Sequence, residues 1–352
     1  MNATSLTSAT IPLTTAIQSG VYFHSDANTF SYVAACLADG LQQLGIPIYS
    51  NIDFSHPVTS FRFTATRDQS SLEKSYCVVM GLEETCEQFP FRVQYVEPVH
   101  ERTVALSMHD NLSNFLLDPG IPLFCTHENR LRKIAGIRVP IAFGVSQSML
   151  QQTTNLPPFS ERREYVLRSF RPSLRQDVRA CLDLTLVPTL QQYLPAETHY
   201  TDSHSQFMDL LSKTRYCLGY GGCFSQNLCL SPTFSAMETC QEFYSHLTFS
   251  SETVVTRWDS WRFWESLVAG CVTIQLDFEK YGFTLPVMPE NWKHYIGLDL
   301  ANIKCDIERM MDERDRMGEI AHNGRLWAIE HYSPISVARR FLKTMHHLYP
   351  EG

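Results

Sequence analysis

The sequence lacks a surplus of basic residues: 29 lysines and arginines stand against 37 aspartates and glutamates, a formal net charge of -8. A protein that binds nucleic acid or an anionic membrane over a large surface needs basic side chains to neutralise phosphates. Residues 161–180 do hold a local cluster of arginines. The overall balance nevertheless predicts that nucleic acid is not a partner.

Long apolar runs and paired cysteine motifs are also missing. No stretch reaches the roughly 18 uncharged apolar residues of a membrane-spanning helix, so no transmembrane segment is predicted. The Ser- and Thr-rich start lacks the basic residues and apolar run of a signal peptide. The 11 cysteines show no CxxC spacing, which indicates reduced thiols rather than disulfides or a zinc site. We therefore expect a cytoplasmic protein.

What the chain does contain is a repeated alternation of buried strands and amphipathic helices. Residues 16–23 form an apolar run that ends in polar residues, and a helical pattern, a glycine and a second apolar run at 46–49 follow. This order is typical of a βαβ unit and a parallel sheet. Further short apolar runs extend the pattern, so residues 1–150 are predicted to form the first α/β domain.

A second α/β domain is predicted after a break. Residues 151–163, with two prolines and little periodicity, read as a linker. The strand and helix pattern then resumes over residues 164–334, and 335–352 has the apolar spacing of a C-terminal helix that packs back on the domains. At 352 residues the chain is longer than chains that usually fold around a single hydrophobic core. Two such domains face a cleft, and ligands of parallel sheets lie beyond the carboxyl ends of strands.

The first candidate site lies in residues 257–292. Ser260 can cap a helix that runs to Ala269, and Arg262 and Glu265 share one face of it. A helix N-terminus with an arginine suits a diphosphate, and a carboxylate one turn later suits a ribose diol. The alternative is an ordinary surface pair of arginine and glutamate, which is common on helices.

Two further motifs follow strand-like runs. Tyr220, Gly221 and Gly222 form a turn where backbone N–H groups can approach a ligand closely, although two adjacent glycines are also simply a tight turn. Arg168 and Arg171 stand where a guanidinium could hold phosphates. Their alternative is a solvated basic face.

These motifs resemble the exostosin-like glycosyltransferases and other GT-B enzymes, whose donor helix reads approximately Ser-x-Arg-x-x-Glu-Ala-Leu-x-x-Gly-Cys-x-Pro. Residues 260–273 match it, with Ser266 and Thr273 replacing the usual Ala and Pro. The resemblance departs at Tyr220, where the family has proline, and at 223–256, which is an insertion. It implies two Rossmann-like domains of a soluble, bacterial-type hexosyltransferase or related enzyme.

The resemblance also implies a chemistry. A nucleotide-diphosphate sugar would be the donor, and a glycan, a lipid-linked glycan or a small molecule would supply the acceptor hydroxyl. Such enzymes generally use helix dipoles and basic side chains instead of a metal, and no cofactor is implied; the sequence shows no convincing Asp-x-Asp. An inverting enzyme needs a base, for which His24 and Asp26 are candidates after the first strand. Alternatively, His24 and Asp26 are helix-cap or surface-loop residues. A retaining enzyme would need no such base.

Other functions remain open on the sequence. A nucleotide-sugar epimerase can share this architecture, and a catalytically silent protein that binds nucleotide or sugar is a third reading. A nicotinamide dehydrogenase is disfavoured, because the first strand is followed by His-Ser-Asp-Ala-Asn and not by G-x-G-x-x-G.

Overall fold

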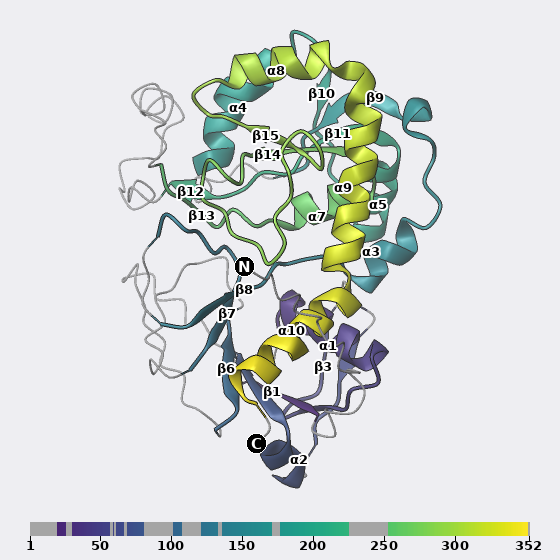
Figure 1. The fold of residues 1–352 in the computed structure, drawn as a ribbon. Coiled ribbons are helices and arrows are strands. Elements are labelled where there is room, and N and C mark those ends of the chain that lie inside the picture. The colour runs from purple at the N-terminus through teal and green to yellow at the C-terminus, as the bar shows by residue number, and fades with distance from the viewer. Residues whose placement is uncertain are drawn as a thin grey trace, which may run out of the picture.

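The computed structural model describes residues 20–25, 30–56, 59, 61–66, 69–80, 101–107, 121–132, 136–170, 177–224 and 253–350. Within these ranges the chain forms two parallel sheets, one in each half of the molecule (Figure 1).

The first sheet contains six parallel strands in the order β2-β1-β5-β6-β7-β8. Alternate side chains of β1 enter different clusters: Val21 and Phe23 join the main core, while Tyr22 packs with Cys77 on the other face. Both faces are thus buried, which explains the nearly continuous apolar runs in the sequence. The strands are β1 (Val21–Ser25), β2 (Ile48–Ser50), β5 (Tyr76–Met80), β6 (Thr103–Leu106), β7 (Leu123–Cys125) and β8 (Arg138–Pro140).

Smaller elements complete the first half. Helix α1 (Tyr32–Gln43) begins at Ser31, whose hydroxyl accepts a hydrogen bond from the backbone N–H of Ala34 at 3.2 Å. The hairpin of β3 (Phe54–Ser55) and β4 (Arg62–Phe63) and the short helix α2 (Gln69–Lys74) lie between β2 and β5.

The second sheet has five parallel strands in the order β10-β9-β11-β14-β15. The short antiparallel pair β12 (Cys223–Phe224) and β13 (Val255–Thr256) brackets residues 225–252, so the body of the predicted insertion lies outside the described residues. The sheet strands are β9 (Arg163–Leu167), β10 (Ala196–Glu197), β11 (Thr214–Leu218), β14 (Val272–Leu276) and β15 (Ile296–Leu298), and the helices are α4 (Asp177–Leu190), α5 (His204–Ser212), α7 (Trp261–Val268), α8 (Ile303–Asp312) and α9 (Met317–Tyr332).

Both sheets follow the same winding. Counted within each sheet, the first strand lies between the second and the third, which is the doubly wound order of Rossmann-like folds. The predicted α/β class with Rossmann-like parallel sheets is therefore confirmed. The predicted linker follows β8 and ends at the first residue of β9. It holds the last two residues of helix α3 (Gln147–Gln152) and the short η1 (Phe159–Glu161).

The C-terminal helix returns to the first half of the molecule, as predicted. Helix α10 (Pro334–Leu348) follows α9 and packs along α1 (Figure 1). Before it, α8 and α9 are separated by the short η3 (Arg314–Arg316). Among the described residues, none of the helices combines the length and apolarity needed to cross a membrane.

The contact between α1 and α10 depends on a glycine. A Cβ atom on Gly40 would lie 1.9 Å from the carbonyl oxygen of Pro334. We expect Gly40→Ala to push the two helices apart and lower the free energy of unfolding by at least about 2 kcal/mol. Urea denaturation measures the loss. Gly318→Ala is the control, because its Cβ would meet only the ring of Phe159, at 3.3 Å; equal stability of the two variants would contradict the expectation.

The halves are also joined near β7. The backbone of Glu128 accepts hydrogen bonds from Thr284 N at 2.9 Å and from the Trp258 indole at 3.1 Å. The side-chain amide of the next residue, Asn129, donates to the carbonyls of Val255 and Tyr281 at 2.9 and 3.0 Å. This segment of the first half is therefore hydrogen-bonded into the second.

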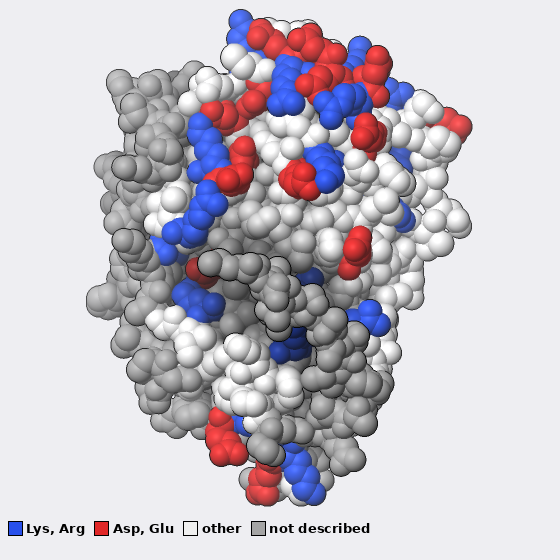
Figure 2. All heavy atoms as spheres, viewed as in Figure 1, with Lys and Arg blue, Asp and Glu red and all other residues white. Residues whose placement is uncertain are grey.

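Charged side chains of both signs gather at the end of the molecule formed by α8 (Figure 2). They form ion pairs along the helix and just after it, such as Arg309 with Glu313 at 2.7 Å. Because the signs alternate, this part of the surface carries no extended field of one sign.

Candidate functional site

A cavity of about 510 Å³ lies at the carboxyl ends of three neighbouring strands of the second sheet. Its lining includes Ser169 and Phe170 after β9, His199 to Thr201 after β10, and Gly221 after β11. Strands β9 and β11 are the neighbours between which the winding reverses. Doubly wound sheets bind ligands at this switch point.

The N-terminus of α7 forms one wall of the cavity through Ser260, Trp261 and Arg262. The Ser260 hydroxyl caps the helix by accepting from Phe263 N at 3.4 Å, and it donates to the Gly219 carbonyl at 2.6 Å. A Cβ on Gly219 would lie 3.1 Å from the Phe263 Cα, so glycine allows the helix to begin this close to β11. The positive end of the helix dipole is therefore directed at the cavity.

Arginine side chains supply further positive charge. Arg179, Arg257 and Arg262 all line the cavity. Arg179 donates to the Tyr220 carbonyl at 3.2 Å and lies over the ring of Phe170. Asp259 is the one carboxylate in this lining, and both of its oxygens already accept hydrogen bonds. The cavity is thus suited to an anion.

A buried hydroxyl adds polar binding capacity. Ser169 is 6% exposed and lines the cavity, and its Oγ has no hydrogen-bond partner among the described residues. Leaving a buried hydroxyl unsatisfied costs about 1–3 kcal/mol. A bound ligand that accepts or donates a hydrogen bond here would recover that cost.

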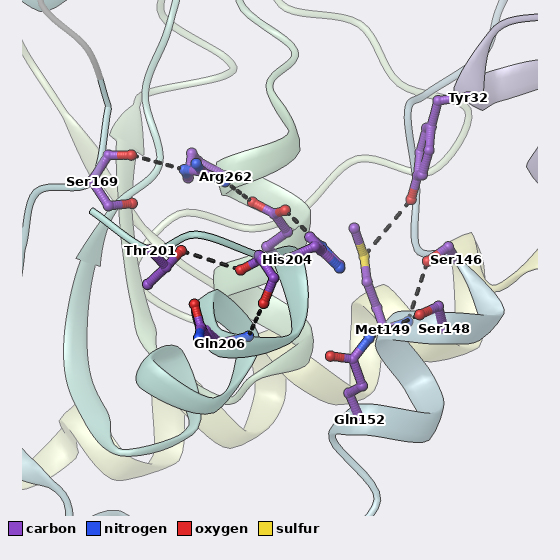
Figure 3. A network of polar contacts seen from close by, with 12 residues as sticks. Tyr32, Ser146, Ser148, Met149, Gln152, Ser169, Thr201, His204, Gln206 and Arg262 are labelled. Carbon is purple, nitrogen blue, oxygen red and sulfur yellow. Dashed lines mark hydrogen bonds and ion pairs between the residues drawn. The ribbon is translucent and has the colours of Figure 1, made fainter. Parts of the chain in front are cut away.

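Arg262 is held by a network of polar contacts (Figure 3). Its Nε donates to the Ser169 carbonyl at 3.1 Å, and its Nη1 lies 2.5 Å from Glu265 Oε2. The other oxygen of Glu265 lies 3.0 Å from His204 Nε2. Burial alone would raise the pKa of the fully buried Glu265, but Arg262 and His204 outweigh it and lower that pKa below its usual value. Glu265 is therefore ionised at neutral pH.

The structure separates one of the two predicted arginines, Arg168, from the cavity. Arg168 is bound by both oxygens of Asp183, with Nε 2.6 Å from Oδ1, and is not among the cavity-lining residues. Arg171 lies outside the described residues. Arg179, on α4, takes the place that the sequence suggested for them.

The predicted turn contributes in a different way from the one expected. Gly221 lines the cavity, and Arg179 Nη2 would lie 3.5 Å from a Cβ placed there. Gly222 adopts a φ of 121°, and a Cβ on it would lie 2.7 Å from the Thr256 carbonyl. Tyr220 is fully buried, and its carbonyl accepts the hydrogen bond from Arg179. The turn shapes the cavity, but the Tyr220 ring is not among the groups that line it.

Of the two candidate bases, the structure describes only His24. His24 is half-buried within β1, where it pairs with Val79, and is not a lining residue. Asp26 lies outside the described residues.

The first half reaches the cavity through aromatic residues instead. Phe143 lines it, and the Trp261 ring lies 4.7 Å from Tyr32 and 6.2 Å from His56. Burial lowers the pKa of His56, so its imidazole is neutral at pH 7. The cavity therefore lies at the border between the two halves.

Sequence reasoning missed several of these residues. Arg257 and Asp259 flank Ser260 closely enough to be suspected, since they precede the capped helix. His204 and Phe143 carry no local signal, because they meet α7 only through the fold. Within the part of the chain that the structure describes, no cluster of His, Cys, Asp and Glu could hold a metal ion.

Comparisons with known proteins give likenesses among solved structures only. No family model matches the sequence, and no curated protein matches it. Among solved structures the chain is similar to an alpha-glucosyltransferase in complex with UDP and a 13-mer DNA containing a central A:G mismatch. The identity is 8% and the TM-score 0.47, over 92% of this chain and 98% of the other. The fold and the cavity define a protein with two Rossmann-like sheets and a cavity lined by arginines. Membership of the exostosin-like family is not confirmed.

Proposed function

We propose that the protein is a glycosyltransferase that binds a nucleotide-diphosphate sugar in the cavity and transfers the sugar to an acceptor hydroxyl. The observation that carries this proposal is the combination of three arginines, a helix N-terminus and the unsatisfied Ser169 hydroxyl at the β9–β11 switch point. Such a set recognises a dianionic group through several hydrogen bonds at once.

The same groups would favour departure of the diphosphate. In the transfer, the acceptor oxygen bonds to the anomeric carbon, and the bond from that carbon to the phosphate oxygen breaks. Its electron pair leaves with the diphosphate, and the proton of the acceptor hydroxyl passes to the departing diphosphate oxygen. Donors already directed at the developing charge stabilise that step without reorganisation. Arg179, Arg257 and Arg262 supply this charge in the proposal, which therefore needs no metal.

The rest of the donor and the acceptor would occupy the two ends of the cavity. Tyr200, 67% exposed in the lining after β10, offers a ring on which a base can stack. The acceptor would enter from the side of Phe143 and Trp261, which belong to the border between the halves. The proposal leaves the acceptor open among a glycan, a lipid-linked glycan and a small molecule.

A thermal-shift panel with UDP, GDP, ADP and dTDP and their sugars tests the proposal. We expect one diphosphate series to stabilise the protein, by about 2.7 kcal/mol at a hundredfold excess over its Kd. NAD should have no effect. Ser169→Ala should weaken the shift, whereas the surface variant Arg316→Ala should keep it. If every diphosphate leaves the melting temperature unchanged, the proposal fails.

Product analysis then identifies the reaction. An incubation with the selected donor should release the nucleoside diphosphate slowly by hydrolysis and faster when an acceptor is added. Interconversion of the sugar without release would indicate the epimerase instead. Binding without any turnover of donor across an acceptor panel would indicate the catalytically silent protein.

A further inference from the structure

We infer that Glu265 is a positioning residue that acts on the donor only through Arg262 and does not contact the ribose. His204 in turn holds the Glu265 carboxylate in place. This rests on the proposed donor site and replaces the ribose-binding role that the sequence suggests. Glu265 has an exposed fraction of 0% and is not among the residues that line the cavity. The part of α7 that lines it ends at Arg262.

Arg262 is fixed from three directions. Glu265 holds Nη1 at 2.5 Å, the Ser169 carbonyl holds Nε at 3.1 Å, and the Phe207 ring lies 3.9 Å from the centre of the guanidinium. No described residue accepts a hydrogen bond from Nη2. Both N–H groups of Nη2 on this rigidly placed cation thus remain for a ligand. A preorganised arginine loses less freedom on binding than a mobile one.

His204 fixes the carboxylate in turn. It is the first residue of α5, its Nε2 lies 3.0 Å from Glu265 Oε1, and its side chain is 20% exposed. Both oxygens of Glu265 are therefore engaged within the protein, one by His204 and the other by Arg262. The chain of contacts runs from α5 through α7 to the wall of the cavity.

Direct ribose binding would require these contacts to break. The carboxylate would have to leave both partners and become accessible, while Arg262 lost its anchor beside the phosphates. Breaking a buried ion pair costs several kcal/mol, more than a hydrogen bond to a ribose hydroxyl returns. The positioning role keeps every contact that the structure shows.

The test compares two ligands that differ only in the ribose. UDP and 2′-deoxy-UDP are titrated calorimetrically into the wild type, Glu265→Gln and His204→Gln. The proposed role predicts that Glu265→Gln weakens both ligands by the same factor, about tenfold or more. His204→Gln should weaken both by a smaller equal factor, because Arg262 keeps its partner. Glu164→Gln is the matched control, since Glu164 pairs with Arg215 and Arg314 away from the cavity.

The contrary outcome is distinct. If Glu265 held the ribose, Glu265→Gln would weaken UDP alone and leave 2′-deoxy-UDP unchanged, which overturns the inference. Equal affinities of Glu265→Gln and wild type for both ligands would overturn it as well. Urea denaturation of each variant checks that the protein is folded. If Glu265→Gln does not fold, the comparison of the two ligands on His204→Gln still tests the inference. Failure of the wild type to bind any diphosphate would instead defeat the proposed function.

Discussion

Arg262→Ala is expected to lower kcat/KM for the donor at least about 100-fold and to destabilise the fold by about 3 kcal/mol. The catalytic loss follows from removing a fixed cation beside the developing charge of the leaving group. The loss of stability follows because the Glu265 carboxylate, with an exposed fraction of 0%, would keep His204 as its sole partner. Donor hydrolysis and urea denaturation measure the two effects.

The pH dependence of stability offers a second readout of this variant. In the wild type the pKa of Glu265 lies below its usual value of 4.5, so the group contributes stability above that pH and loses it as the pH falls through the lowered pKa. Without Arg262 that contribution is expected to vanish. The difference in the free energy of unfolding between the wild type and Arg262→Ala should therefore shrink in acid. A difference that grew in acid would contradict this account.

Two controls separate charge from geometry. Arg262→Lys keeps the charge but loses the fork of donors that joins Ser169 and Glu265, and should recover much of the stability and little of the rate. Arg316→Ala removes an arginine that is 51% exposed and pairs with Glu313, and should cost less than about 1 kcal/mol. If Arg262→Ala resembled Arg316→Ala, the assignment of Arg262 would be wrong.

Asp259→Ala is expected to destabilise the protein by about 3 kcal/mol and to loosen the border between the halves. One carboxylate oxygen accepts from the Phe143 N–H at 2.8 Å and the other from the Trp264 indole at 2.6 Å, and Asp259 itself is 2% exposed. The substitution leaves two buried donors without acceptors, at about 1–3 kcal/mol each. Because Phe143 comes from the first half, the loss also frees one wall of the cavity.

Urea denaturation and limited proteolysis of the segment around Phe143 check this expectation. Asp259→Asn should be intermediate, because an amide offers one acceptor where the carboxylate offers two. Asp209→Ala is the control, since Asp209 is 64% exposed and pairs with Lys213 at the surface. Comparable losses for Asp209→Ala and Asp259→Ala would show that the buried bonds contribute nothing.

The local sequence pattern was sufficient to predict an element wherever its structure depends on residues close to it in the chain. The sequence predicted a helix that is capped by Ser260 and runs to Ala269, and the structure has α7 over Trp261–Val268, with β14 (Val272–Leu276) directly after it. Gly270 ends the helix with a φ of 70°, as a glycine after a last turn does. Caps, glycines and apolar runs act over a few residues, so they can be read without the fold.

Pairing between distant residues could not be read in this way. The sequence predicted Arg168 as a phosphate ligand, but Asp183, 15 residues away on α4, binds it, and Arg179 of the same helix lines the cavity. In the sequence, an arginine that follows a strand looks the same whether it binds a ligand or forms an ion pair within the protein. Which one meets a ligand depends on how α4 packs against the sheet.

The sequence by itself determined the α/β class, the parallel strands and the capped helix that begins beside Arg262, because periodicity and capping are local properties. Only the tertiary structure decided that Glu265 contacts His204, 61 residues away, and does not line the cavity. The same holds for Phe143, which reaches Asp259 from the other half of the molecule across 116 positions. Such contacts arise when helices and strands that are already determined pack together, and no spacing in the chain records them.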